Sequence, residues 1–465
     1  MRVDLYSGLR EARALACAFG SMAFRIGDPS PHIKGIATDS REVLAGDLFV
    51  ALRGAFTDGA MYLGEALERG ASALLMPFDV APPMGSYWLM QVNDPQSALM
   101  NAVRLRRRLC GGRVIAISGS TGKTTVKEAV AALLSEHGHV EKSEGNFNSG
   151  IGMPLSFLSM EEANFYVLEL GISHPHEMEE MAHALLPHIA VLTNVGSAHI
   201  GNFESYAALV HEKLGIAAAQ TGEDILLIPE ELDTPLLKSI SSVIYRVGRG
   251  ERADFCAEKV VFNAEGTRAS LRFGEREIRE LFWGVPGRAG LSSLMLAASV
   301  GVLCGLDDRR IREGLSRASS STPRMKKLTH GKRLLLEDCY NASPESVATS
   351  LESTVLLAGS RPTVAVLGDM AELGDRSEAL HRAVGECAAR DGIGMLITYG
   401  KLANGIKKGA VLAGMSEERI HSFEKGEEGA LIDTILRRTP ENAVVLFKGA
   451  RKMALEKIML ELRRT

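Results

Sequence analysis

Short runs of consecutive apolar residues recur along the chain, and amphipathic stretches of helical period separate them. The clearest runs are 48–52, 114–117, 165–168, 189–195, 334–336, 364–367 and 443–447. A run without polar interruption is typical of a strand that is buried on both faces of a parallel sheet. Strands that alternate with helices indicate a doubly wound arrangement, so the pattern predicts an α/β fold with buried parallel strands.

The pattern divides the chain into three α/β units, with expected boundaries at 1–108, 109–322 and 323–465. A chain of 465 residues is long enough for about three domains. The first unit is a small α/β domain, and the second is a parallel-sheet domain that carries the only phosphate-loop pattern. The third is a Rossmann-like α/β domain without such a loop. Between the first two, the helical stretch 101–108 carries four arginines, which we expect on a solvated face.

The second unit opens with an apolar strand, a tight glycine turn and the start of a helix. Glycines let the backbone approach an anion, the new helix points free N–H groups at it, and a lysine and a hydroxyl can meet phosphate and Mg²⁺. Ile117 stands where the strict motif has glycine, so this is a shortened variant. The alternative is an ordinary glycine turn. The candidate nucleotide-binding residues are Gly119, Ser120, Thr121, Gly122, Lys123, Thr124 and Thr125.

Two further polar residues lie just beyond apolar runs. Glu169 comes after one run and His199 after the next. Either residue alone is typical of an ordinary loop. Because ligands of parallel α/β sheets sit at the carboxyl ends of the strands, both are expected near Lys123 and Thr124. Carboxylate, imidazole and hydroxyl groups at one edge favour a site for Mg²⁺ and phosphate.

Two loops are compatible with either a turn or a ligand site. Residues 144–152 are rich in amides and glycines and contain Asn146 and Asn148, which suit a turn or a substrate loop. Ser40 and Arg41 lie in a Thr-Asp-Ser-Arg run, which suits a turn with a solvated arginine or a site for an anionic ligand.

Composition narrows the classes of partner. The chain has 53 basic and 57 acidic residues and a net charge of −4 without a long run of one sign, so nucleic acid is not expected as the principal partner. Six cysteines stand far apart without a Cys-x-x-Cys pair, which is typical of reduced thiols in a cytosol. No stretch reaches the roughly 18 uninterrupted apolar residues of a membrane span, and the first residues lack the apolar core of a signal peptide. We expect a cytoplasmic protein without membrane insertion.

Several short motifs together resemble the Mur ligases of peptidoglycan synthesis. They are Ser-Gly-Ser-Thr-Gly-Lys-Thr-Thr at 118–125, Gly-Asn-Phe-Asn at 145–148, Leu-Glu-Leu-Gly at 168–171, Asn194-Val with His199, Tyr-Asn-Ala-Ser-Pro at 340–344, Leu-Gly-Asp-Met-Ala-Glu-Leu-Gly at 367–374 and Lys-Gly-Ala-Arg at 448–451. The resemblance covers nearly the whole chain, in the family's order. It is greatest to the branch that joins D-alanyl-D-alanine to UDP-N-acetylmuramoyl-tripeptide. No Asp-Asn-Pro-Arg motif appears, which speaks against the branch that adds the third peptide residue.

The resemblance implies ATP and two Mg²⁺ ions as cofactors, an acyl-phosphate intermediate and a monomer. Lys123 and the loop amides would hold the β- and γ-phosphates, Thr124 and Glu169 one Mg²⁺, and His199 the second. Lys213 aligns with a lysine that family members carry as a carbamate, although by spacing alone it is a solvated helical lysine. The resemblance further assigns Arg324 to the γ-phosphate, Asp338 to the ribose, Tyr340 and Asn341 to the adenine side, Ser40 and Arg41 to the uridine diphosphate, and Asn146 and Asn148 to the sugar-peptide path.

The chain departs from the family at a few positions. Gly290 and Ser293 stand where two asparagines are expected near adenine, and Ala450 replaces a serine. Two alternative functions of the protein therefore stay open. One is a related ligase that accepts a single amino acid, and the other is a non-catalytic, nucleotide-gated binding protein.

Overall fold

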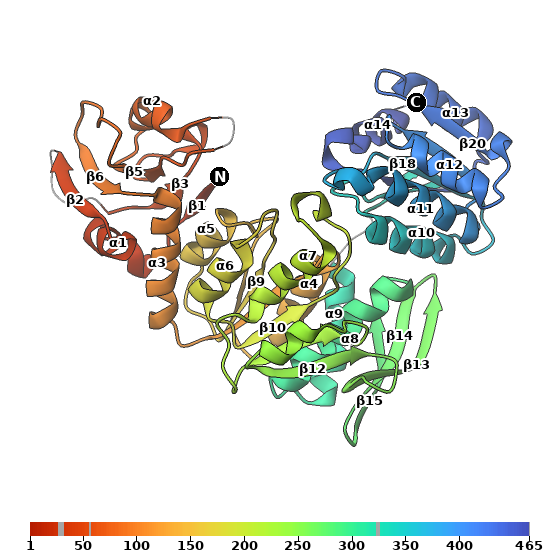
Figure 1. Cartoon of the computed structure of the whole chain (residues 1–465), viewed down its shortest axis with the longest axis horizontal. Coiled ribbons are helices and arrows are strands. Elements are labelled where there is room, and N and C mark those ends of the chain that lie inside the picture. Colours follow the sequence, from red (N-terminus) through yellow and green to blue (C-terminus); the bar gives the residue numbers. More distant parts are fainter. Residues whose placement is uncertain (27–31, 55–56, 322–325, 465) are drawn as a thin grey trace.

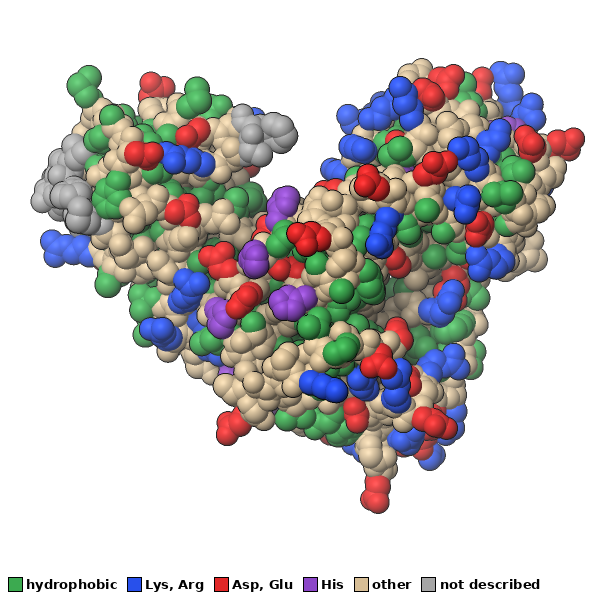
Figure 2. All heavy atoms as spheres, viewed as in Figure 1, with side chains coloured by type: hydrophobic (Ala, Val, Ile, Leu, Met, Phe, Trp, Pro, Cys, Tyr) green, Lys and Arg blue, Asp and Glu red, His purple; other side chains and the backbone are tan. Residues whose placement is uncertain are grey.

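The structure is a computed structural model, which describes residues 1–26, 32–54, 57–321 and 326–464. Three separate β-sheets follow one another along the chain, and each is flanked by helices, as the sequence predicts for an α/β protein of three domains. The N-terminal and C-terminal domains stand on either side of the central domain (Figure 1). In the space-filling view an open gap separates these two outer domains, and the central domain forms its floor (Figure 2).

The N-terminal domain is built on a six-stranded sheet of order β1-β3-β4-β5-β6-β2. Its four central strands are parallel, and β1 and β2 are antiparallel at the two edges. Along β4, Leu48 and Val50 belong to the core that contains α1 and α3, whereas Phe49 belongs to the core on the α2 side. The elements are β1 (Arg2–Asp4), α1 (Ala12–Phe19), β2 (Met22–Ile26), β3 (Gly35–Ala37), β4 (Leu48–Val50), α2 (Leu63–Glu68), β5 (Ala73–Pro77), β6 (Tyr87–Val92) and α3 (Pro95–Leu109).

The central domain has a nine-stranded sheet of order β15-β14-β13-β12-β11-β10-β7-β9-β8, parallel from β8 to β13 and extended by antiparallel β14 and β15. Ile115 and Ile117 of β7 pack on the face that α4 and α8 cover, and Val114 and Ala116 pack on the other face. The elements are β7 (Arg113–Ser118), α4 (Lys123–Leu134), β8 (Val140–Lys142), α5 (Gly152–Ser159), β9 (Phe165–Glu169), α6 (Glu177–Leu185), β10 (Ile189–Leu192), α7 (Tyr206–Leu214), β11 (Ile225–Pro229), β12 (Val243–Gly248), β13 (Phe255–Asn263), β14 (Gly266–Phe273), β15 (Arg276–Trp283), α8 (Gly287–Leu303) and α9 (Asp308–Ser321).

The C-terminal domain has a six-stranded sheet of order β16-β17-β21-β18-β19-β20. All its strands are parallel except β16, which forms an antiparallel hairpin with β17. The elements are β16 (Lys326–His330), β17 (Arg333–Glu337), α10 (Pro344–Ala358), β18 (Thr363–Gly368), α11 (Ser377–Arg390), β19 (Met395–Tyr399), α12 (Asn404–Leu412), β20 (Ile420–Phe423), α13 (Glu428–Arg438), β21 (Val444–Lys448) and α14 (Leu455–Leu462).

The predicted strands and helices are present, with differences at their ends. The run 189–195 is a strand only to Leu192. Among the described helices, none is long and apolar enough to cross a bilayer.

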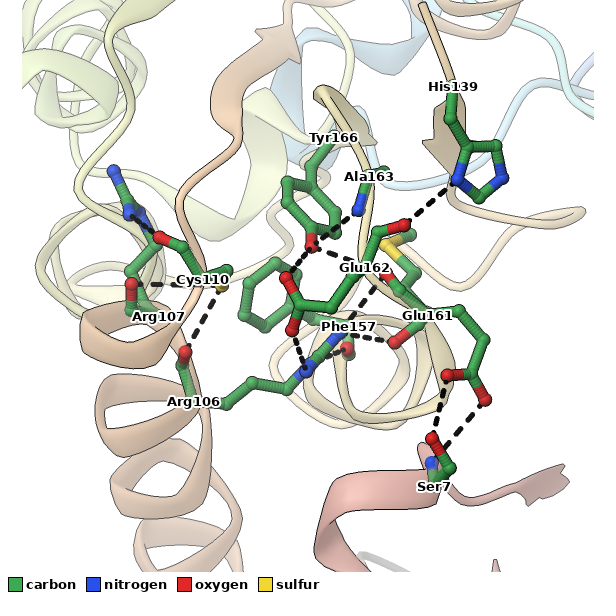
Figure 3. Close-up of polar contacts among 11 residues, drawn as sticks. Ser7, Arg106, Arg107, Cys110, His139, Phe157, Glu161, Glu162, Ala163 and Tyr166 are labelled. Carbon is green, nitrogen blue, oxygen red and sulfur yellow. Dashed lines mark hydrogen bonds and ion pairs between the residues drawn. The ribbon is translucent and has the colours of Figure 1, made fainter.

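The expectation that the arginines of α3 are solvated is wrong for Arg106. Its side chain is 1% exposed, and its guanidinium lies 3.9 Å from the centre of the Tyr6 ring. It donates hydrogen bonds to the backbone carbonyls of Phe157 and Met160, just where α5 ends (Figure 3). Helix periodicity places an arginine on a face but does not reveal that a neighbouring loop covers that face. Arg106 therefore anchors α3 to the central domain.

Candidate active site

Two cavities open beside the phosphate loop. The first, of about 490 Å³, is lined by small hydroxyl side chains of α8 and α10, among them Ser293 and Ser353. The second, of about 600 Å³, is lined by Lys123, Glu169 and His199. Thr121, Gly122, Asp338, Ser346 and Lys448 line both cavities. The two are therefore parts of one cleft between the central and C-terminal domains.

The phosphate loop has the backbone geometry that its glycines predict. Gly119 has a φ of +142°, and a Cβ placed there would lie 2.0 Å from Thr193 Oγ1. Gly122 has a φ of +89° and directly precedes α4, whose first residue is Lys123. The Thr121 N–H donates to Asn194 Oδ1 at 3.0 Å, which ties the loop to the end of β10. The free N–H groups at the start of α4 can therefore face an anion.

Lys123 and Thr124 are held by partners inside the protein. The Lys123 ammonium donates to the Gly119 carbonyl at 2.8 Å. Thr124 Oγ1 donates to Glu169 Oε2 at 2.8 Å, and Asn148 Nδ2 donates to Glu169 Oε1 at 2.7 Å. Ile117 of β7 pairs with Glu169 of β9, so the prediction that Glu169 lies at the same sheet edge as the phosphate loop is confirmed.

The donor set at Thr124 and Glu169 suits a hard cation. Mg²⁺ takes oxygen ligands and is usually held by one or two carboxylates together with substrate phosphates. Among the described residues no group of three or more His, Cys, Asp or Glu side chains could hold a metal by itself. A hydroxyl and a buried carboxylate beside a phosphate loop fit an ion that takes its other ligands from a nucleotide.

His199 also lines the second cavity, and it pairs through Nδ1 with Glu372 of the C-terminal domain. The pairing lowers the pKa of the Glu372 carboxyl. Both residues have left-handed backbone, with φ of +65° and +60°. A non-glycine residue with such a φ is uncommon and is held there by its surroundings.

Lys213 is buried in α7 and does not line either cavity. Its side chain is 1% exposed, and burial, reinforced by the positive charge of Lys123, lowers its pKa from 10.5 to about 7. Glu212 and Glu345 act in the opposite direction. Glu212 is itself engaged by the N–H groups of His176 and Met178. The expectation of a solvated lysine is therefore wrong, because α7 packs this face against the rest of the domain.

Asp338, at the end of β17, lies where the cavities meet. It accepts hydrogen bonds at 2.6 Å from the hydroxyl of Ser350 and from the ammonium of Lys448, which is 3% exposed. Tyr340 and Asn341 line the second cavity together with Asn146. The resemblance assigns Tyr340 and Asn341 to the adenine side, and both residues line the second cavity but not the first.

Three family models match successive parts of the chain. They are described as the Mur ligase family catalytic domain over residues 32–81, the Mur ligase middle domain over 117–301, and the Mur ligase glutamate ligase domain over 323–451. The UDP-N-acetylmuramoyl-tripeptide–D-alanyl-D-alanine ligase of Bacillus subtilis is 31% identical over 92% of this chain and 93% of its own length. The chain belongs to the Mur ligase family.

Similarity to further Mur ligases supports this assignment. The ligase of the same description from Treponema pallidum is 33% identical, covering 91% of this chain and 92% of its own. A crystal structure of MurF from Acinetobacter baumannii has the same fold over 100% of both chains, with a TM-score of 0.88 and 24% identity. The Thermotoga maritima MurF ligase in complex with ADP has a TM-score of 0.77 and 25% identity, and covers 92% of this chain and 97% of that one.

The residues expected on the uridine diphosphate side lie in this Mur ligase's N-terminal domain and line neither cavity. Ser40 is buried and donates to Glu65 at 2.8 Å. Asp39 caps the short turn that follows it and pairs with the Arg41 guanidinium, which lowers the pKa of Asp39 to about 2. Arg324 lies outside the described residues.

Gly290 leaves no room for the asparagine that the resemblance expects. A Cβ at Gly290 would lie 1.8 Å from the Val285 carbonyl oxygen, so any larger residue would displace the start of α8. Ser293 Oγ donates to the Ala289 carbonyl within the helix at 3.0 Å. The first cavity of this Mur ligase is therefore lined there by short side chains.

Sequence reasoning missed two carboxylates of the C-terminal domain. Glu345 accepts a hydrogen bond from the Ser197 N–H at 2.7 Å, and Glu372 pairs with His199. Glu372 lies within a motif that was recognised, but nothing local indicates that it reaches another domain. The contacts exist only because the loop after β10 meets the C-terminal domain at the first turn of α10 and at the loop after β18.

Proposed function

We propose that this Mur ligase joins D-alanyl-D-alanine to UDP-N-acetylmuramoyl-tripeptide and converts one ATP to ADP and phosphate, yielding UDP-N-acetylmuramoyl-pentapeptide. Two bacterial relatives with this activity in their names match more than nine-tenths of the chain. The observation that carries the proposal is that residues of two domains line one cleft. The phosphate loop and Glu169 come from the central domain, and Asp338 and Lys448 come from the C-terminal domain.

The proposed reaction has two steps. A terminal carboxylate oxygen of the tripeptide attacks the γ-phosphorus of ATP, the bond from that phosphorus to the β–γ bridging oxygen breaks, and ADP leaves. The amine of D-alanyl-D-alanine then attacks the carbonyl carbon of the acyl phosphate, loses a proton, and expels phosphate. Lys123 and the N–H groups of the loop stabilise the charge of the transferred phosphoryl group. Closure of the domains around this cleft would hold the reactants in place and keep water from the acyl phosphate.

The residues that would hold two Mg²⁺ ions are Thr124 and Glu169 for one and His199 for the other. Such ions neutralise phosphate charge when they are bound. Lys213 is proposed as a further ligand after its amine adds to carbon dioxide and releases a proton, which converts a cation into a carbamate. The lowered pKa of Lys213 supports this proposal, because only a neutral amine attacks carbon dioxide.

The remaining roles stay proposals. They assign Arg324 to the γ-phosphate, Asp338 to the ribose, Tyr340 and Asn341 to the nucleotide, Asn146 and Asn148 to the sugar-peptide path, and Ser40 and Arg41 to the uridine diphosphate. We further propose a cytoplasmic monomer with domains at 1–108, 109–322 and 323–465. The six free cysteines support a reducing compartment.

The test is to incubate the protein with ATP, Mg²⁺ and UDP-N-acetylmuramoyl-tripeptide and to offer D-alanyl-D-alanine or single amino acids as acceptors. Phosphate release and product mass are followed together. The proposal expects the pentapeptide only with the dipeptide, and a Lys123→Ala variant is expected to form none. Turnover with a single amino acid would instead identify the related ligase. Binding of ATP without turnover when all reactants are present would identify a non-catalytic binding protein.

A further inference from the structure

Two carboxylates of the C-terminal domain hold one loop of the central domain, residues 194–201. Glu345, in the first turn of α10, accepts from the Ser197 N–H at 2.7 Å. Glu372, in the loop after β18, pairs with Nδ1 of His199. The loop that carries a proposed metal ligand is therefore part of a joint between two domains.

Backbone contacts surround the pair of Glu372 and His199. The Glu372 carbonyl accepts from the Gly201 N–H at 2.9 Å. A Cβ on Gly201 would lie 2.5 Å from the Gly374 nitrogen, so the two loops touch without an intervening side chain. Both members of the pair also hold left-handed backbone. The meeting of carboxylate and imidazole is thus built into the joint and is not a chance contact of two flexible side chains.

The pairing decides which ring nitrogen of His199 can bind a cation. A neutral imidazole carries one N–H donor and one acceptor nitrogen, and an ionised carboxylate only accepts. With Glu372 on Nδ1, the proton sits on Nδ1 and the lone pair is on Nε2. Histidines that bind metals usually have such a partner on the other nitrogen, and its loss costs about 10- to 100-fold in metal affinity or activity.

We propose that Glu372 is a positioning residue that reaches from the C-terminal domain to fix the tautomer and the ring orientation of His199, so that Nε2 is prepared to bind the second divalent cation. This inference rests on the proposed metal role of His199. Because the partner belongs to another domain, the histidine is prepared only when the C-terminal domain is docked against loop 194–201. Binding of the second cation and docking of the C-terminal domain then favour each other.

The test measures binding of Mn²⁺ to the full-length protein with a non-hydrolysable ATP analogue, by electron paramagnetic resonance. Glu372→Ala is expected to weaken the second Mn²⁺ by about 10- to 100-fold. Glu372→Gln keeps an acceptor oxygen and is expected to lose less. Asp375→Asn removes an exposed carboxylate three residues further along the same loop and is expected to leave both ions unchanged. In a turnover assay, Glu372→Gln should have a higher KM for Mg²⁺ than the wild type. At saturating Mg²⁺ its kcat should equal that of the wild type.

Two further variants separate the possible failures. Glu345→Ala removes the other carboxylate of the joint without touching His199 and is expected to lose less Mn²⁺ affinity than Glu372→Ala. An equal loss in the two variants would overturn the inference. Unchanged Mn²⁺ binding in Glu372→Ala would overturn it as well. If His199→Ala binds both ions normally, the metal role of His199 in the proposed function fails. If His199→Ala loses the second ion and Glu372→Ala does not, only the positioning role fails.

Discussion

The buried amine of Lys213 should make the unfolding free energy of this protein depend on pH. The side chain is 1% exposed, and its pKa falls from 10.5 to about 7 on folding, chiefly through burial. In the described part of the chain, no carboxylate oxygen lies within ion-pair distance of it. At about 1.4 kcal/mol per pKa unit, burial of the charged form costs about 5 kcal/mol. Lys213→Met, which fills a similar volume without a charge, should therefore stabilise the protein while abolishing ligation.

The sign follows from proton binding in the two states. Below pH 7 Lys213 is charged in the folded and in the unfolded protein, so folding carries the full free-energy cost of burying the charge. Between pH 7 and 10.5 the unfolded chain still binds a proton on Lys213, whereas the folded chain does not. The stability of the wild type therefore rises with pH in that window. Relative to Lys213→Met, the gain between pH 7 and pH 9 is about 2 kcal/mol, or about 4–8 °C in melting temperature for a domain of this size.

The assay is urea unfolding of both proteins at pH 7, 8 and 9 in buffers free of carbon dioxide, because a carbamate would remove the amine. Lys127→Met is the matched contrast. Lys127 is equally buried, but it donates to the Ser143 carbonyl at 2.6 Å and pairs with Glu128 at 3.0 Å, so its loss should destabilise by about 2 kcal/mol. A difference between wild type and Lys213→Met that stays constant from pH 7 to pH 9 would refute the reasoning. So would a less stable Lys213→Met at pH 7.

Three further substitutions test single contacts. Glu169→Gln removes the carboxylate that Thr124 bonds and should lower phosphate release by about 100-fold with the circular dichroism spectrum unchanged; full activity would contradict its role. Gly119→Ala places a Cβ 2.0 Å from Thr193 Oγ1 at a φ of +142°. The variant should lose about 1–3 kcal/mol of unfolding free energy in thermal denaturation. Calorimetry should also show weaker binding of ADP. Arg106→Met leaves two buried backbone carbonyls without donors and should cost about 2–4 kcal/mol in urea unfolding, whereas exposed Arg108→Met should change little.

The sequence alone determined the local elements and the edge of the central sheet where the polar residues gather. Apolar runs predict buried strands because a parallel strand must hide both faces, and Gly119 and Gly122 predict the loop because only glycine adopts their backbone angles easily. Lys123, Thr124 and Glu169 followed directly, since they lie within a few residues of a strand end. The approach of Thr124 to Glu169 needed only the topology of neighbouring parallel strands.

Only the tertiary structure determined the contacts between elements that are distant in sequence. Arg106 and Lys213 have the helical spacing of solvated residues, and their burial depends on which loop or helix packs over that face. Glu372 finds His199 across a domain boundary, 173 residues along the chain. Local pattern encodes which face of an element is apolar, because that follows from the period of helix or strand. It does not encode which neighbour covers a polar side chain, because that depends on how whole sheets and helices come together.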